Sequence, residues 1–256
     1  EWFIKIAIVC LGTKLGMKAI DATGFAMELL VTGMCATIAA YLLFWPLVYT
    51  LARRAFKVSR EWAATLASGI SICGVSASIA TGGAIRARPI VPVMVSGIVV
   101  VFALVELIIL PPVLTYTPWF EEPMAAGSSL GLTVKTDGAD AASGAITDQL
   151  MRTRAQEELG IKWEEGWITS ASVMTKIWID MFIGVWALVL AMIWLYYVEK
   201  RPGEKVEKME VWWRFPKFVL GYFVAWFAVM LLGLTLMPAE SMEFGIHPVE
   251  GPMRKM

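Results

Sequence analysis

Apolar residues along this chain gather into long runs that are separated by shorter polar stretches. Several of these runs reach or exceed the roughly 20 residues that an α-helix needs to cross a bilayer. A soluble core does not require repeated unbroken apolar runs of that length. The pattern therefore predicts an all-α, polytopic transmembrane helix bundle. The predicted spans lie near residues 2–15, 27–51, 63–84, 90–117, 124–146, 172–198 and 215–237, and a polar tail follows at 238–256.

Two segments inside this pattern have an unusual composition. Residues 66–83 and 127–144 are built mainly from Gly, Ser, Ala and Thr, whereas a lipid-facing helix is rich in Leu, Ile, Val and Phe. Small residues let helices pack closely, so packing alone is one explanation, and an external loop is another for 127–144. The third explanation is a pair of interrupted helices whose freed backbone groups hold a small ligand. We favour two interrupted helices.

The overall composition narrows the class of protein. The chain is 58% hydrophobic and 17% charged, with a formal net charge of zero, so no global field attracts nucleic acid. The three cysteines have no CxxC spacing, and Cys73 is expected to pack as a small buried residue. The lone histidine, His247, lies in the polar tail, which excludes a His-based metal centre or catalytic triad. We therefore expect no enzyme, no metal and no cofactor.

Basic loops predict the orientation in a bacterial-type cytoplasmic (inner) membrane. The stretches 53–60 and 200–214 are rich in Lys and Arg, so both are expected on the cytoplasmic side. The two loops lie on the same side if all four segments between them cross the bilayer, which would place Arg86 and Arg88 outside. A re-entrant hairpin at one of the two small-residue segments would leave an odd number of crossings and put the two loops on opposite sides.

The interrupted segments also supply the candidate site. A broken helix presents a half-helix N-terminus with free N–H groups, which suits a small anion. Charged side chains at bilayer depth cost about 2.5–3.5 kcal/mol each on insertion scales, so they are expected to have a function. Asp180 is expected at the membrane interface instead. The predicted substrate-binding residues are Ser68, Gly69, Ser71, Cys73, Gly74, Ser76, Thr133, Lys135 and Lys14, and the predicted ion-coupling residues are Glu106, Asp137 and Asp140.

Part of the chain resembles a known family. The pattern G-x-S-I-C-G-x-x-A-x-x-A, which starts at Gly69 and ends at Ala80, is similar to the signature of the YeiH family of proposed sulfate exporters. Weaker similarities lie at Lys5, Gly12, Lys14 and Leu15, and at Thr133, Val134 and Gly144. Many relatives carry a histidine and an acidic residue after the Thr-Val pair, where this chain has Lys135 and Thr136.

The resemblance implies a multi-span transporter with an inverted repeat, related in architecture to cation–proton antiporters and bile-acid symporters. It also implies that this chain lacks helices at both ends. The expected function is secondary transport or export of a small sulfate-like or sulfonate-like anion. The alternative is a structural subunit of a membrane complex, derived from a transporter. The expected partners are the anion, the lipid bilayer, and further membrane subunits or a second copy of the chain.

Overall fold

The computed structural model describes residues 33–199 and a few single residues between 217 and 231. Lys14, the predicted span at 2–15 and the polar tail lie outside the described residues. Within 33–199 every regular element is a helix, which confirms the predicted all-α class. Three described helical stretches are long and apolar enough to cross a membrane, namely Gly33–Arg54, Ile90–Tyr116 and Trp167–Val198.

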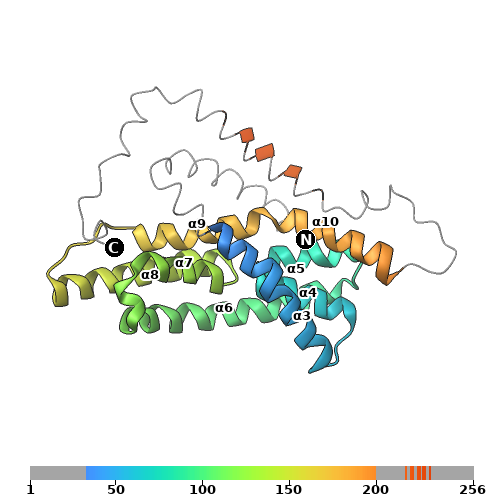
Figure 1. The fold of residues 1–256 in the computed structure, drawn as a ribbon, viewed down its shortest axis with the longest axis horizontal. Coiled ribbons are helices and arrows are strands. Elements are labelled where there is room, and N and C mark those ends of the chain that lie inside the picture. Colours follow the sequence, from blue (N-terminus) through green and yellow to red (C-terminus); the bar gives the residue numbers. More distant parts are fainter. Residues whose placement is uncertain are drawn as a thin grey trace. The chain divides into compact units, whose positions relative to one another are not determined.

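Figure 1 shows the order of the helices in this part of the chain. The α-helices are α3 (Trp45–Arg54), α4 (Arg60–Ser71), α5 (Gly74–Ala84), α6 (Ile90–Tyr116), α7 (Pro123–Thr133), α8 (Asp137–Arg154), α9 (Trp167–Met181) and α10 (Ile183–Ile193). The short elements are η1 (Ala39–Phe44), η2 (Pro118–Glu121), η3 (Ala155–Leu159) and η4 (Trp194–Val198). Each predicted small-residue segment is split into two helices, so the predicted interruptions are confirmed.

The first interrupted segment folds back on itself. Helix α4 ends at Ser71, and the chain restarts as α5 at Gly74 after two residues of non-helical backbone. The Thr81 hydroxyl donates a hydrogen bond to the Ser68 hydroxyl at 2.7 Å. In one continuous helix these two residues would lie roughly 20 Å apart. Helices α4 and α5 therefore form an antiparallel pair, which we call hairpin 1.

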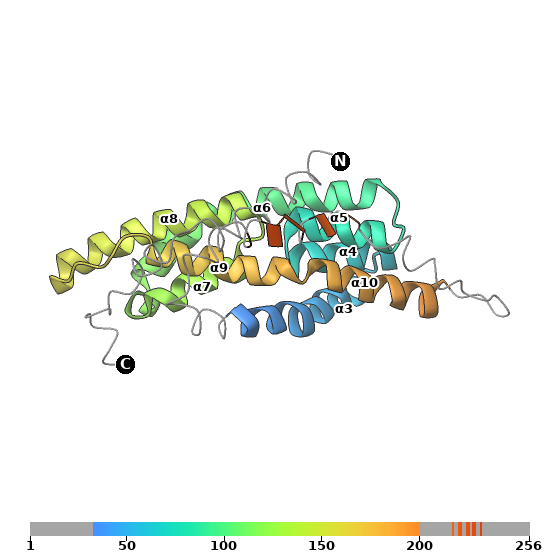
Figure 2. The ribbon, with the colours of Figure 1, turned by 90° about the horizontal axis from the view of Figure 1, so that it is seen from above.

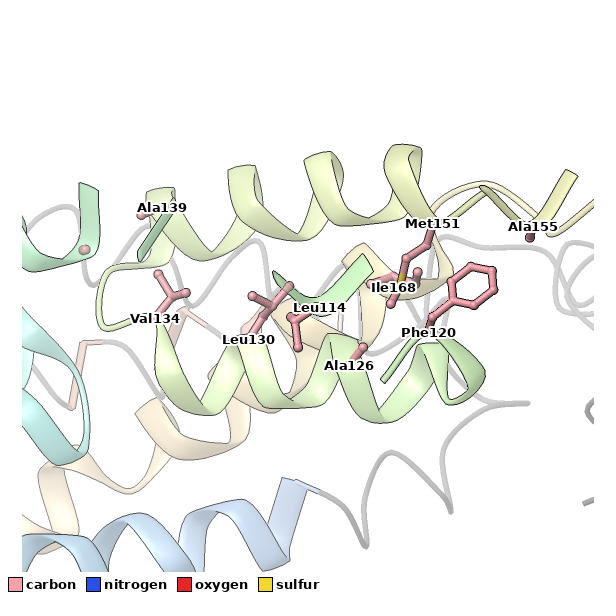
Figure 3. Close-up of a cluster of buried hydrophobic side chains, with 10 residues drawn as sticks. Leu114, Phe120, Ala126, Leu130, Val134, Ala139, Met151, Ala155 and Ile168 are labelled. Atoms are coloured by element: carbon pink, nitrogen blue, oxygen red, sulfur yellow. The ribbon is translucent and has the colours of Figure 1, made fainter. Parts of the chain in front are cut away.

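The second interrupted segment, residues 127–144, also folds back on itself as two antiparallel helices. Helix α7 ends at Thr133 and α8 begins at Asp137, and Gly131 of α7 and Gly144 of α8 both pack against Ser172 of α9. Figure 3 shows α7 and α8 side by side, with apolar side chains filling the space between them. We call this pair hairpin 2. Its buried apolar cluster comprises Ala103, Leu114, Phe120, Ala126, Leu130, Val134, Ala139, Met151, Ala155 and Ile168.

That these two segments cross the bilayer stays a prediction, and the short helices favour a hairpin in each segment instead. Each of α4, α5 and α7 has only 11 or 12 residues, too few to span about 30 Å of hydrocarbon alone. The hairpins instead enter from opposite ends of the bundle, while α6 and the continuous α9–α10 run past both (Figures 1 and 2). Along α6, Pro92 packs against Gly82 of hairpin 1, and the carbonyl oxygen of Thr115 accepts a hydrogen bond from Arg154 at the far end of hairpin 2.

The two ends of this bundle carry opposite charge. We call the end with the 55–59 and 85–89 turns the basic end, and the end with residues 117–122 and 155–166 the acidic end. Charged residues at the basic end include Arg53, Arg54, Lys57, Arg60, Arg86 and Arg88. Those at the acidic end include Glu121, Glu122, Glu157, Glu158, Glu164 and Glu165. If each hairpin enters and leaves the membrane on one side, the basic loops 53–60 and 200–214 still lie on the same side, as expected from the sequence.

This topology changes the expected side of two loops. Four crossings would place Arg88 outside and Glu121 inside, whereas two hairpins that each enter and leave the bilayer on one side would keep Arg88 on the expected cytoplasmic side and put Glu121 outside. We expect Arg88→Cys, like a Lys57→Cys reference, to react with a membrane-impermeant maleimide only when the cytoplasmic face is open to it. Glu121→Cys should react from the opposite face. Labelling of Arg88→Cys from the outside of intact cells would contradict the hairpin topology.

Candidate functional site

The tips of the two hairpins meet each other. The backbone N–H of Gly74, at the start of α5, donates a hydrogen bond of 2.7 Å to the carbonyl oxygen of Lys135, between α7 and α8. The chain is extended on both sides of this contact, at Cys73 (φ −139°, ψ 127°) and at Thr136 (φ −128°, ψ 137°). Two stretches of irregular backbone thus come together beside the long helices α6 and α9, and such backbone is tolerated at membrane depth only when protein or a cavity surrounds it.

A glycine is needed where the tips touch. A Cβ atom on residue 74 would lie 2.5 Å from Cγ1 of Val99 and 3.0 Å from the carbonyl oxygen of Lys135. Cβ atoms in proteins essentially never lie this close to a neighbour, so the neighbouring atoms would have to move. One of these neighbours is a backbone oxygen, which moves less easily than a side chain. The Gly in the Ser-Ile-Cys-Gly run therefore permits the close approach of hairpin 2 and of α6.

Two lysines donate hydrogen bonds to carbonyl oxygens near the C-terminal ends of the helices that end at the tips. Lys176 of α9 is 2% exposed, and its ammonium group donates a hydrogen bond of 3.1 Å to the carbonyl oxygen of Ile72. The Lys135 ammonium group donates to the carbonyl oxygen of Leu132 near the end of α7. The last carbonyls of a helix have no partner within the helix and carry partial negative charge. Each lysine therefore stabilises the C-terminal end of one tip.

Acidic side chains gather at the same place. The Cys73 thiol and the carboxylates of Asp137 and Asp180 each offer an atom within 4.8 Å of the others, close enough for one cation to contact all three. Asp180 also interacts electrostatically with Lys176 and with Asp140. One oxygen of Asp137 and one of Asp180 are buried without a hydrogen-bond partner. The site is therefore a dense arrangement of charges of both signs.

Several predicted site residues are at or beside these tips. The Ser71 hydroxyl is buried without a hydrogen-bond partner, next to the break, and the Ser76 hydroxyl donates to the Cys73 sulfur at 2.7 Å. Glu106 of α6 interacts electrostatically with Lys135. Asp140 lies at the first turn of α8, is 1% exposed, and accepts a hydrogen bond of 2.5 Å from Ser172. Together with Cys73, Gly74, Lys135 and Asp137, these residues surround the contact between the hairpins.

Three other predicted residues have different surroundings. The Ser68 hydroxyl accepts hydrogen bonds from the Trp45 indole at 2.9 Å and from Thr81, so it holds α3, α4 and α5 together. A Cβ on Gly69 would lie 2.6 Å from the Ser78 hydroxyl oxygen, which gives Gly69 a packing role inside hairpin 1. Thr133 is the last residue of α7 and is exposed. Lys14 lies outside the described residues.

Three residues of this site, Lys176, Asp180 and Tyr41, are not among the predicted site residues. The sequence predicts no role for Lys176 and an interfacial position for Asp180, yet the structure places both in the middle of the stretch Trp167–Val198. Tyr41 donates a hydrogen bond of 2.8 Å to the carbonyl oxygen of Ile179 and interacts electrostatically with Asp180. The sequence does contain a signal for Lys176 and Asp180, because two charged residues four positions apart on one face of an apolar span point to a functional site.

These features define a class: an α-helical membrane protein with two opposed helical hairpins whose tips form a charged site. A family model described as "Conserved hypothetical protein 698" matches residues 1–247, and the chain belongs to this family. It is the family that the Ser-Ile-Cys-Gly signature indicated.

Relatives carry membrane-protein names. The chain is 60% identical over 259 residues to a UPF0324 membrane protein of Nitrosomonas europaea, which covers all of this chain and 53% of the relative. It is 30% identical over 224 residues to a UPF0324 membrane protein of Rhodopirellula baltica, covering 87% of this chain and 37% of the relative. The chain thus spans about half or less of the length of these relatives. No solved structure matches it.

Proposed function

We propose that this chain contains the substrate site of a secondary transporter for a small anion. The observation that carries the proposal is the hydrogen bond between Gly74 and Lys135, which joins two re-entrant tips among buried charges. Irregular backbone and ionisable side chains are both unfavourable in hydrocarbon, and they occur together where a transporter binds its substrate near the midplane. A subunit that only packs against its neighbours does not require either feature.

The chemistry of the tips favours an anion as the substrate. Helices α5 and α8 both begin at the contact, so the free N–H groups of two first turns point to the same region. Gly138, in the first turn of α8, has no other atom within 4 Å of the place where a Cβ would lie, which leaves its backbone accessible. The Ser71 hydroxyl has no partner, and the Lys135 and Lys176 ammonium groups supply positive charge.

The test is transport by the full-length protein that contains this chain, reconstituted in liposomes. We expect uptake of radiolabelled sulfate, sulfite or a small sulfonate above that of empty liposomes. In the variant Ser71→Ala, loss of a hydrogen bond to a charged substrate should weaken the apparent affinity by roughly tenfold or more. The control is Ser170→Ala, which removes an exposed hydroxyl on the first turn of α9.

One result would contradict the proposal, and a second would change the residues assigned to the substrate site. Folded wild-type protein that moves none of these anions, and instead purifies in a stable complex with other chains, would favour a structural subunit. Equal transport by Ser71→Ala and Ser170→Ala would remove Ser71 from the substrate site.

A further inference from the structure

Acidic groups outnumber basic groups around the hairpin tips. The ionisable groups that face this region are Tyr41 from η1, Cys73 from hairpin 1, Glu106 from α6, Lys135, Asp137 and Asp140 from hairpin 2, and Lys176 and Asp180 from α9. Four of them are carboxyl groups and two are lysines, which leaves an excess of two negative charges when all six are ionised. A bound anion would add to that excess in a region of low dielectric constant.

We propose that Asp137 and Asp180 together bind a monovalent cation, H⁺ or Na⁺, that moves with the transported anion. This inference rests on the proposed function and assigns its coupling site. The two side chains come from different parts of the fold, since Asp137 starts α8 at the tip of hairpin 2 and Asp180 lies on α9. Their carboxylate oxygens and the Cys73 sulfur lie within 4.8 Å of one another.

The neighbouring lysines do not neutralise this carboxylate pair by direct contact. The Lys176 ammonium donates to the carbonyl oxygen of Ile72, and the Lys135 ammonium donates to that of Leu132. Among the described residues, neither Asp137 nor Asp180 takes part in an ion pair within 4.0 Å. Two carboxylates so close together in a buried site do not both stay ionised unless another cation binds between them. Without such a cation, one of the two takes up a proton.

Further buried oxygens accompany the pair. Asp137 and Asp180 each have one buried oxygen without a hydrogen-bond partner. The hydroxyls of Ser71 and Thr175 are also unpartnered, and these residues are only 2% and 1% exposed. Ser71 directly precedes the break in hairpin 1, and Thr175 directly precedes Lys176 on α9. Buried polar atoms in native proteins are nearly always satisfied, so the unpartnered carboxylate oxygens of Asp137 and Asp180 favour a proton or another cation between them.

The experiment uses the reconstituted full-length protein with the membrane potential held at zero by K⁺ and valinomycin. One arm imposes a tenfold H⁺ gradient without Na⁺, and the other a tenfold Na⁺ gradient at equal pH. We expect one of these gradients to drive about tenfold accumulation of sulfate per coupled cation, on the side to which the cation flows. Asp137→Asn and Asp180→Asn should lose this accumulation, whereas Glu164→Gln, an exposed carboxylate between α8 and α9, should keep it.

A second measurement does not depend on transport. In detergent, either NaCl should raise the Tm relative to choline chloride, or sulfate addition should cause proton uptake that an indicator dye detects. Either response should disappear in Asp137→Asn and Asp180→Asn and persist in Glu164→Gln.

Sulfate transport that neither gradient biases would overturn the coupling site and leave the proposed function standing. Cation binding without transport of any anion would overturn the proposed function and leave the cation site standing.

Discussion

Replacing Lys176 with Met should lower both the stability and the transport activity of this protein more than any other single change in α9. The Lys176 side chain is buried, and its ammonium group donates to the carbonyl oxygen of Ile72 at the tip of hairpin 1. It also interacts electrostatically with Asp180, as Lys135 does. Removing one partner from a buried charged network costs about 3–5 kcal/mol, because the remaining charge and carbonyl lose their compensation. We expect a lower Tm in detergent and loss of anion uptake in liposomes.

A matched variant separates this effect from the loss of a lysine in general. Lys162 lies exposed between α8 and α9, so Lys162→Met should keep the wild-type Tm and uptake. Lys176→Arg keeps the charge, and we expect it to recover part of the stability. If Lys176→Met keeps wild-type Tm and uptake, this lysine does not stabilise the tip of hairpin 1.

The second large effect is expected at Gly74. In Gly74→Ala the new methyl group would collide with Val99 and crowd the carbonyl oxygen of Lys135, so α6 and the tip of hairpin 2 would both have to shift. Overpacking of this kind typically costs about 1–3 kcal/mol. Because the tip contact is also the proposed substrate site, we expect anion uptake to be lost even in molecules that remain folded. Uptake per folded molecule, with folding checked by gel filtration and Tm, is the measurement.

The same helix provides the control for this substitution. Gly83, near the end of α5, has no atom within 4 Å of the place where a Cβ would lie. Gly83→Ala should therefore change the unfolding free energy by less than about 1 kcal/mol, in the stabilising direction that Ala gives a helix. Equal uptake by Gly74→Ala and Gly83→Ala would show that close contact between the tips is not required for transport.

The long spans and the two interruptions could be predicted from the sequence, because both depend on local composition. The predicted span 90–117 coincides with α6 (Ile90–Tyr116), since an apolar run of that length has few other stable states in a membrane. The direction of the chain after each interruption could not be predicted. Whether α5 continues α4 or folds back beside it depends on contacts between distant residues, such as the hydrogen bond from Thr81 to Ser68.

Only part of the candidate site could be predicted, because local composition marks some of its residues and tertiary contacts bring in the others. Cys73, Gly74, Lys135 and Asp137 lie in the small-residue segments that the composition marked, and the structure brings them together. Ser68 and Gly69 have the same composition around them but pack inside hairpin 1, because small residues serve both close helix packing and ligand binding. Asp180 belongs to the site only because α9 runs past both tips, which is a property of the tertiary fold.

The most direct test of the tip-to-tip contact is a disulfide bond across it. In full-length protein whose other cysteines are replaced by serine, Asp137→Cys would place a second thiol beside Cys73, whose sulfur lies within 4.8 Å of the Asp137 carboxylate. A disulfide requires Cβ atoms about 3.5–4.5 Å apart. Because the ends of the two side chains already lie close together, we expect mild oxidation in membranes to join residues 73 and 137 in one chain. Peptide mass spectrometry should detect this link. Gly138→Cys, whose Cβ would meet no other atom within 4 Å, should give none. Absence of the 73–137 link, or equal linkage at 138, would contradict the meeting of the two hairpins.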